Sequence, residues 1–143
     1  MAQLSPYLTF NGNCMEAFEF YRSVFGGEFS AIMKNSDIPE GVPSMPGTDP
    51  EKLLHISLPI SAETVLMGCD MPAAYGQAVF GTNFAISINT AGEEETTKLF
   101  NGLSAGGKIT MPLGDTFWGA FFGMFIDKFG IHWMVSYNKN PQK

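Results

Sequence analysis

The sequence predicts an α+β fold made of two paired βαβββ modules. Residues 13–27 and 90–107 repeat one order, in which a capping residue is followed by an amphipathic helix and a pair of glycines. Each copy follows one strand-like run and precedes three more. Two copies are too few for a solenoid. We therefore expect two paired modules, with the functional site in the cleft between them.

Length and composition limit the classes of protein to consider. The 143 residues fit a single domain over residues 1–143, which buries its core without disulfides or structural metal. Thirteen Phe and nine Met exceed what a small monomer's interior needs, and this surplus predicts an apolar pocket, a subunit interface, or both. A net charge of −6 with only eight Lys and Arg argues against nucleic acid or an anionic membrane as a partner.

The termini and the cysteines favour a cytoplasmic protein. The first residues show no basic start with an apolar run before a cleavage site, and no run approaches the length of a membrane span. Cys14 and Cys69 match neither a CxxC redox motif nor the spacing of a zinc site. We expect both to be reduced thiols in the cytoplasm.

The first module is expected over about residues 4–70. Its helix begins at Asn13, where Glu16 can close a capping box, and ends at Gly26 and Gly27. Apolar residues at steps of three and four predict one buried stripe: Cys14, Ala17, Phe18, Tyr21, Val24 and Phe25. Apolar runs predict the strands at residues 4–10, 29–34, 53–60 and 64–69.

Residues 35–50 are predicted to form a long loop. They contain four prolines and two glycines, which is too many breakers for a regular element. A loop of this length in a compact domain is either mobile or functional, for instance as a lid over a pocket. A second connector, at residues 71–81, leads to the second module.

The second module is expected over about residues 82–138. Thr90 and Glu93 are predicted to cap its helix, which ends at Gly106 and Gly107. The inward stripe is predicted to consist of Thr96, Leu99, Phe100 and Leu103. The strands are predicted at residues 83–89, 108–111, 117–126 and 131–137, with turns at residues 113–115 and 127–130.

Ordered motifs run through nearly the whole chain: residues 6–13 (PYLTFNGN), Glu16-Ala17, Phe20-Tyr21, residues 25–27 (FGG), His55, Leu66-Met67, Asp70, residues 117–119 (FWG), residues 127–130 (DKFG) and Trp133. With the duplicated module, they resemble the PhnB-like branch of the vicinal oxygen chelate superfamily. That group includes glyoxalase I, bleomycin-resistance proteins and extradiol dioxygenases. The resemblance implies curved mixed sheets around a cleft and, commonly, a homodimer. Some members carry the label 3-demethylubiquinone-9 3-methyltransferase, which we disfavour because the chain lacks a βαβ pattern with a glycine-rich turn.

The resemblance also implies where a metal would bind. In metal-dependent relatives, four ligands, commonly His or Glu, come from the first and last strands of each module. Counting back from the helix caps and matching the last strands places these positions on Pro6, Asn83, Met67 and Met134. Such residues are poor ligands for hard divalent ions, so we expect no metal and no cofactor. A register shift of two residues offers instead Leu8, Ala85, Val65 or Cys69, and His132 or Ser136.

Several side chains are candidates for contacting a ligand. His55 shares a strand face with Ser57 and is either a general base or hydrogen-bond donor, or a half-buried histidine satisfied by a neighbour. Trp118 and Phe122 belong to the most aromatic stretch, which forms either a stacking surface or sheet core and dimer interface. Tyr75, in the connector, is either a cap over a pocket or a plain loop residue.

The sequence therefore predicts metal-independent binding of a small apolar or aromatic molecule between Met67, Asn83, Phe122 and Met134. His55, Trp118 and Tyr75 are further candidate ligand contacts, and His55 is the weak candidate for catalysis. Two alternatives remain open. One is a metal-dependent lyase, isomerase or dioxygenase of the vicinal oxygen chelate type. The other is an interaction module without a ligand, which would show an extensive apolar interface.

Overall fold

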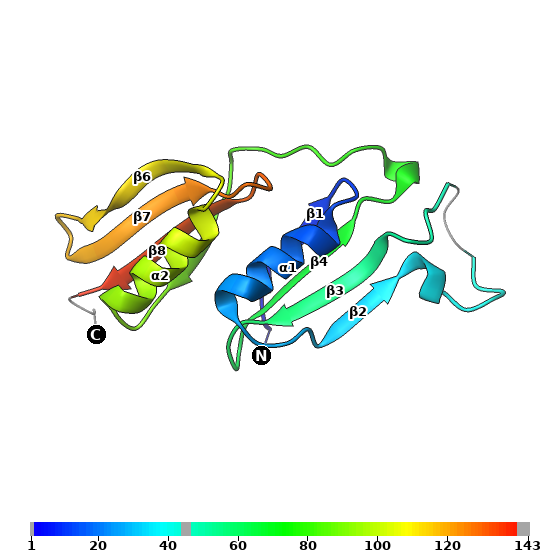
Figure 1. The fold of residues 1–143 in the computed structure, drawn as a ribbon, viewed down its shortest axis with the longest axis horizontal. Coiled ribbons are helices and arrows are strands. Elements are labelled where there is room, and N and C mark those ends of the chain that lie inside the picture. The colour runs from blue at the N-terminus through cyan, green and yellow to red at the C-terminus, as the bar shows by residue number, and fades with distance from the viewer. Residues whose placement is uncertain (1, 44–46, 140–143) are drawn as a thin grey trace. The chain divides into compact units, whose positions relative to one another are not determined.

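The computed structural model describes residues 2–43 and 47–139. Its elements follow the predicted order (Figure 1): β1 (Tyr7–Phe10), α1 (Cys14–Phe25), β2 (Ala31–Lys34), β3 (Leu53–Pro59), β4 (Val65–Asp70), β5 (Ile86–Asn89), α2 (Glu93–Ser104), β6 (Lys108–Asp115), β7 (Ala120–Ile126) and β8 (His132–Asn138). The chain forms two compact units that divide after Val79, within the predicted connector. The first unit contains β1 to β4 and the second contains β5 to β8.

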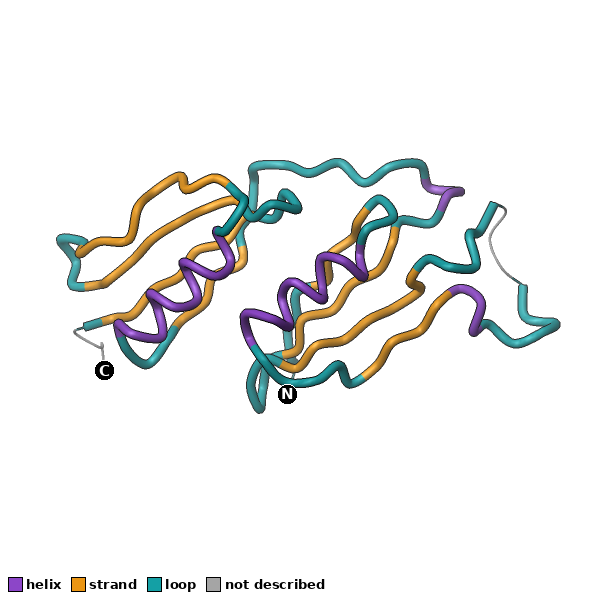
Figure 2. Tube along the Cα trace, viewed as in Figure 1, coloured by secondary structure: helices purple, strands orange, loops and turns teal. Residues whose placement is uncertain are grey.

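Each unit contains a four-stranded mixed sheet with one helix beside it (Figure 2). The strand order is β1-β4-β3-β2 in the first unit and β5-β8-β7-β6 in the second. In both, the first strand is parallel to the last, with Tyr7 opposite Met67 and Ser87 opposite Met134. The remaining pairs are antiparallel. The predicted α+β fold of two βαβββ modules is therefore confirmed.

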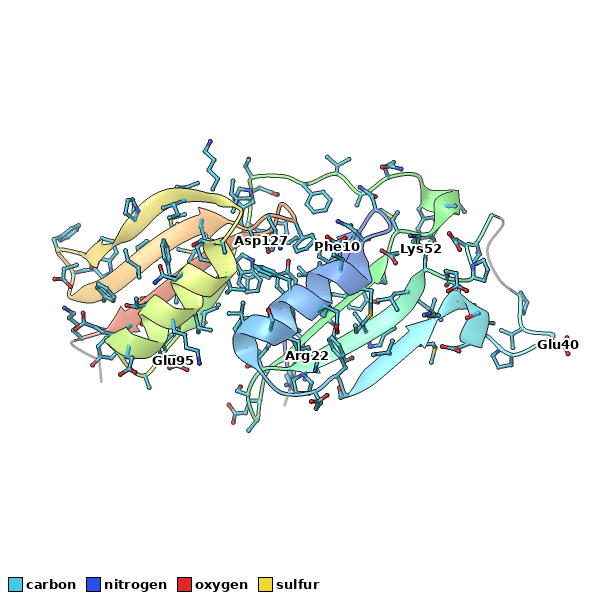
Figure 3. The ribbon with its side chains drawn as sticks, viewed as in Figure 1. Phe10, Arg22, Glu40, Lys52, Glu95 and Asp127 are labelled. Atoms are coloured by element: carbon cyan, nitrogen blue, oxygen red, sulfur yellow. The ribbon has the colours of Figure 1, made fainter. Side chains whose placement is uncertain are left out.

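One face of each sheet packs against the helix of its unit. The buried residues of α1 are Cys14, Ala17, Phe18 and Tyr21, whereas Val24 and Phe25, also predicted for this stripe, are only partly buried. The buried stripe of α2 is Thr96, Leu99, Phe100 and Leu103, as predicted. Phe10 of β1 (Figure 3) meets Phe18 edge to face, with ring centroids 6.3 Å apart. A Cβ added at Gly68 would lie 2.8 Å from the Phe18 ring, and one at Gly123 would lie 2.6 Å from the Phe100 ring. These two glycines therefore mark the helix-facing side of each sheet.

The strand register then gives the side chains on the other side of each sheet, which we call its open face. Successive residues of a strand alternate between faces, so residues adjacent to the helix-facing ones lie on the open face. In the first unit the open face carries Tyr7, Thr9, Ala31, Met33, His55, Ser57, Met67 and Cys69. In the second unit it carries Ser87, Asn89, Met111, Phe122, Met124, Ile126, His132, Met134 and Ser136.

The start of α1 differs from the predicted capping box. Asn13 is the N-cap, but its side chain makes no capping hydrogen bond. Instead the buried carboxylate of Asp70, at the end of β4, accepts hydrogen bonds from the backbone N–H groups of Cys14 and Leu53, each at 2.9 Å. A residue 56 positions away in sequence thus satisfies the helix terminus and links it to the start of β3.

The start of α2 also differs from the prediction. Its N-cap is Gly92 rather than Thr90, and the Thr90 hydroxyl donates to the Gly92 carbonyl at 3.1 Å. Glu95, and not Glu93, reaches back and accepts from the Ala91 N–H at 3.0 Å. The hydroxyl of Thr90 thus serves the turn before the helix, so the helix begins two residues later than a cap at Thr90 implies.

The β6–β7 hairpin corrects a predicted turn. Residues 113–115 lie in β6, where register shifts absorb the irregular stretch around Pro112 and Gly114. The turn falls at residues 116–119, where Gly119 donates to the Thr116 carbonyl at 3.3 Å. Phe117 and Trp118 consequently lie in this turn and not in β7, and their side chains are 97% and 59% exposed.

The other departures concern element ends and loops. β1 begins at Tyr7, directly after Pro6, and β5 begins at Ile86 rather than at Asn83. The loop predicted at residues 35–50 contains a short 3-10 helix, Asn35–Asp37, and residues 44–46 of it lie outside the described residues. No helix in the described ranges has both the length and the apolar character that crossing a membrane requires.

Candidate functional site

Four polar side chains meet on the open face of the first sheet, and we call them the Tyr7 cluster: Tyr7, His55, Ser57 and Cys69. The Tyr7 hydroxyl lies 3.4 Å from Nδ1 of His55, and Nε2 of His55 lies 2.7 Å from Oγ of Ser57. Cys69 lies on the same face and contributes to raising the pKa of Tyr7. Tyr7, His55 and Ser57 thus form a continuous chain of polar contacts between β1 and β3.

The Tyr7 cluster joins a half-exposed phenol to a buried hydroxyl. Tyr7 is 48% exposed, whereas Ser57 is 7% exposed. Partial burial, followed by the influence of the neighbouring Cys69, raises the pKa of Tyr7 to about 12. The phenol therefore stays protonated near neutral pH and acts there as a hydrogen-bond donor and acceptor, not as a base.

Met67 lies between two members of this cluster. The register places Tyr7 on one side of Met67 and Ser57 on the other, in neighbouring strands and on the same face. Met67 is half-buried, and its flexible thioether can adapt to an apolar ligand. The structure thus brings the predicted Met67 and His55 together, and it adds Tyr7 and Ser57, which sequence reasoning did not assign to the site.

The open face of the second sheet carries a row of methionines beside polar side chains. Met134 is paired with Met124, and Met124 with Met111, so three methionines form a row across β8, β7 and β6. Phe122 lies two residues before Met124 in the same strand, and its ring centroid is 6.2 Å from that of Trp118. The predicted Met134, Phe122 and Trp118 therefore belong to one apolar surface.

Two of the four predicted metal positions lie outside the strands. Pro6 lies directly before β1, where its carbonyl accepts from the Met67 N–H at 3.0 Å, and Asn83 lies before β5, which begins at Ile86. The first-strand residues paired with Met67 and Met134 are Tyr7 and Ser87.

Tyr75 lies apart from the sheet strands. It is the last residue of a short 3-10 helix, Ala73–Tyr75, and its side chain is 67% exposed. A role as a pocket cap therefore stays a prediction.

The residues on the open faces do not fit the four-ligand metal site of the metal-dependent relatives. The first sheet offers His55 and Cys69, the second offers His132, and neither open face carries a carboxylate among its described strand residues. In the described part of the chain, no three His, Cys, Asp or Glu side chains gather into a possible metal site. Two such donors in one sheet rarely suffice to hold a divalent ion.

A pocket of about 270 Å³ lies beside the Tyr7 cluster in the first unit. It is lined by the start of β3, the end of β4 and parts of the adjoining loops, including Leu53, Cys69, Met71 and Pro72. Cys69 belongs to both the pocket wall and the Tyr7 cluster. Both cysteines are free thiols, as predicted, and burial raises the pKa of Cys14.

Comparison with known proteins places the chain in a family. The model of the family described as 3-demethylubiquinone-9 3-methyltransferase matches residues 2–136. The sequence is 34% identical over 140 residues to protein YjdN of Escherichia coli (strain K12), and the match covers 93% of each chain. An uncharacterized protein of Mycobacterium bovis, Mb0911c, is 29% identical over 92% of this chain and 80% of its own length.

Solved structures agree with this placement. Protein PA1353 from Pseudomonas aeruginosa has a TM-score of 0.81 at 40% identity, covering 96% of this chain and 98% of its own. A putative 3-demethylubiquinone-9 3-methyltransferase, PhnB protein, from Bacillus cereus has a TM-score of 0.73 at 25% identity, covering 95% and 99%. A glyoxalase/bleomycin resistance protein/dioxygenase family enzyme from Burkholderia phytofirmans PsJN shares the fold, with a TM-score of 0.60 at 15% identity over 96% and 99%. The chain therefore belongs to the family described as 3-demethylubiquinone-9 3-methyltransferase, and it shares its fold with a PhnB protein and with a glyoxalase/bleomycin resistance/dioxygenase family enzyme.

Proposed function

We propose that this protein binds a small apolar or aromatic molecule on the open faces of its sheets, without a divalent metal ion. The observation that carries the proposal is that a methionine lies in the middle of the last strand of each module. Met67 and Met134 hold these positions, paired with Tyr7 and Ser87 of the first strands. A thioether beside a hydroxyl favours contact with carbon and with a single polar group, and it disfavours a hard cation.

The second sheet supports the apolar part of the proposal. Met111, Met124 and Met134 present adjacent thioethers, and Phe122 and Trp118 add aromatic rings beside Met124. Ligand sites are lined mainly by apolar and aromatic side chains, with a few polar groups that fix the orientation. On the first sheet, considered by itself, Met67 supplies an apolar contact and the neighbouring Tyr7 and Ser57 supply polar groups of that kind.

The proposal does not extend to methyl transfer, although the family carries that description. A Rossmann-like site for a methyl donor needs successive parallel strands joined by helices, with a glycine-rich turn after the first strand. Among the described strands, the parallel pairs are β1 with β4 and β5 with β8. After β1 the chain continues through Asn11, Gly12 and Asn13 into α1, without a glycine-rich turn.

A ligand screen tests the proposal. We expect members of a broad apolar and aromatic panel to raise the melting temperature of the protein, because a ligand that binds only the folded state stabilises it. Met67→Ala and Met134→Ala are each expected to lower the affinity for the best ligand by roughly fivefold to tenfold, because about 1 kcal/mol of apolar contact is lost. Met15→Ala, on α1 outside its buried stripe, is the matched control and should leave the affinity unchanged.

The same preparation tests metal independence. We expect elemental analysis and titration with divalent ions to find no stoichiometric metal in the protein. A stoichiometric ion that is lost in His55→Ala or His132→Ala would overturn the proposal in favour of a metal-dependent lyase, isomerase or dioxygenase. An absence of any thermal shift across the panel would favour an interaction module without a ligand.

We also propose that the protein is a homodimer in the cytoplasm. Exposed apolar side chains such as Phe117 and Phe84, at 97% and 63% exposure, support a subunit interface. Two free thiols support the reducing compartment. Light scattering on the purified protein should give twice the mass of the 143-residue chain, and the mass of a single chain would exclude the dimer.

A further inference from the structure

We propose that Tyr7 and His55 form a proton relay that binds an acidic hydroxyl group of an aromatic or enolic ligand and takes up its proton. The inference rests on the proposed function, since it names the class of ligand for the open face of the first sheet. It is carried by the order of the contacts in the Tyr7 cluster, in which a half-exposed phenol leads to an imidazole and the imidazole leads to a buried hydroxyl.

The hydrogen bonds of the cluster can run in only one direction at a time, because each member has one proton to donate. Tyr7, neutral His55 and Ser57 each carry one proton on a polar atom, and two contacts join them. A neutral imidazole donates from one nitrogen and accepts at the other. Because a phenol is more acidic than a serine hydroxyl, the favoured direction runs from Tyr7 to Nδ1 of His55 and from Nε2 to Ser57.

In this arrangement the Tyr7 oxygen keeps a lone pair for a ligand. Its proton points to His55, and the side chain is 48% exposed, which leaves room for a ligand to approach the oxygen. The contact between Tyr7 and His55 is long, at 3.4 Å, and contacts of this kind commonly shorten once a ligand is bound. A hydroxyl group of a ligand can therefore donate to Tyr7 while Tyr7 donates to His55.

Transfer along these two contacts moves two protons by one step each. The net result is that the ligand loses one proton and the protein gains one. The ligand O–H bond breaks as a new O–H bond forms on Tyr7, and the former Tyr7 proton passes to Nδ1 of His55. The products are a ligand oxyanion that accepts a hydrogen bond from Tyr7, and an imidazolium that donates to Tyr7 and to Ser57. Both nitrogens of the imidazolium then have an acceptor, and the opposite charges attract one another.

The acidity of the groups limits the ligand class. The pKa of a histidine side chain is generally about 6.5, and that of a simple phenol is about 10. An ordinary phenol would therefore keep its proton, whereas an electron-poor phenol or an enol with a pKa near neutrality would lose it. Burial raises the pKa of Tyr7 to about 12, so Tyr7 passes the proton on and does not itself become the stored anion.

The surroundings of His55 make proton uptake depend on the ligand. The titratable groups facing it are Tyr7 from β1 and Cys69 from β4, and β2 places Met33 opposite it. The described open face of the first sheet offers no carboxylate to balance an imidazolium. The adjoining pocket of about 270 Å³ is slightly below the usual size of ligand pockets, about 300 to 1,000 Å³, and suits a ligand with one ring.

Two chromophoric probes test the relay directly. Para-nitrophenol carries an acidic hydroxyl whose ionisation changes its visible absorption, and para-nitroanisole is the matched ether without that hydroxyl. At a pH equal to the solution pKa of para-nitrophenol, half of the free probe is still protonated, and a histidine with the ordinary pKa of about 6.5 is mostly neutral. We expect the wild-type protein to bind it as the phenolate, to take up its proton without releasing it to the buffer, and to bind para-nitroanisole about tenfold more weakly.

Variants assign the roles of the two residues. Tyr7→Phe should abolish the phenolate band and lower the affinity for para-nitrophenol by about tenfold, because the hydrogen bond to the anion is lost. His55→Gln keeps a hydrogen-bonding side chain but cannot store the proton, so para-nitrophenol should bind only in its neutral form. Tyr137→Phe is the matched control, since Tyr137 lies outside the cluster and on the helix-facing side of the second sheet, and it should leave the phenolate band unchanged. Near-ultraviolet circular dichroism establishes that each variant is folded.

The possible results separate the relay from the proposed function. A phenolate band that survives His55→Gln overturns the relay. The relay is also overturned if both probes bind with equal affinity and without ionisation, or if the protein binds other members of the apolar panel but neither probe. In both of these cases the proposal of small-molecule binding still stands. No binding of either probe or of any member of the panel overturns both proposals.

Discussion

Asp127→Ala is expected to lower the free energy of unfolding by at least about 3 kcal/mol. Asp127 (Figure 3) is 3% exposed and its carboxylate accepts three hydrogen bonds. Oδ1 accepts from the backbone N–H groups of Phe129 and Ile131, at 2.8 and 3.1 Å, and Oδ2 accepts from the indole N–H of Trp133 at 2.8 Å. Each buried donor left without its partner costs about 1–3 kcal/mol. Asp127 thus holds the turn predicted at residues 127–130, and its bond to Trp133 extends this role into β8.

Chemical denaturation followed by tryptophan fluorescence measures this loss. Asp115→Ala is the matched control, because Asp115 is an exposed aspartate whose ion pair with Lys139 is expected to contribute less than about 1 kcal/mol. Equal losses in the two variants would contradict the account of Asp127.

A double-mutant cycle identifies the indole contribution. In Asp127→Asn the amide keeps one oxygen for the two backbone N–H groups but turns its own N–H₂ toward the Trp133 indole. Two facing donors repel, so Asp127→Asn should destabilise the protein less in a Trp133→Phe background than in the wild type. Additive losses would show that the contact between Asp127 and Trp133 contributes no coupling energy.

The elements that sequence alone predicts correctly are those set by local periodicity. Both buried helix stripes and the order of the strands follow from spacings of two, three and four residues. The predicted capping contacts of both helices, and the predicted start of α2, are wrong for a physical reason. Asp70 reaches Cys14 from 56 residues away, and no local pattern records that contact. In α2 the residue before the helix is Gly92, and the nearby Thr90 resembles a cap in sequence while its hydroxyl bonds to the turn.

The contacts of the candidate site also divide into those that local sequence patterns predict and those that depend on distant strand pairing. Alternation along single strands correctly places His55 with Ser57, as their 2.7 Å contact shows. The partnership of Tyr7 with Met67 depends on parallel pairing between β1 and β4, which lie 60 residues apart. Register across such a distance is set by the folded sheet and not by either strand alone. The contacts of the Tyr7 hydroxyl therefore cannot be predicted from local sequence patterns. The one signal in the sequence is a tyrosine at the start of a strand.

The glycine pairs illustrate how one motif can serve two physical purposes. Gly106 has a φ of +77°, which fits the predicted helix stop. Gly107 has no positive φ, so its conformation does not require glycine. A Cβ at Gly107 would lie 2.1 Å from the carbonyl oxygen of Ile126, far inside van der Waals contact. Gly107 is therefore required for space, where the start of β6 approaches the end of β7.

Gly107→Ala is accordingly expected to lower the free energy of unfolding by about 2–4 kcal/mol, since the backbone around Ile126 must move. At an unstrained position the same change commonly stabilises a protein by about 0.4–1 kcal/mol, because the unfolded chain loses freedom. Gly114→Ala is the matched control in the same strand, because no heavy atom lies within 4 Å of its added Cβ. Denaturation should therefore show opposite signs, or a loss confined to Gly107→Ala. If both variants were equally stable, the close approach of Gly107 to β7 would not constrain the residue, and the second glycine would have to be explained by the helix stop alone.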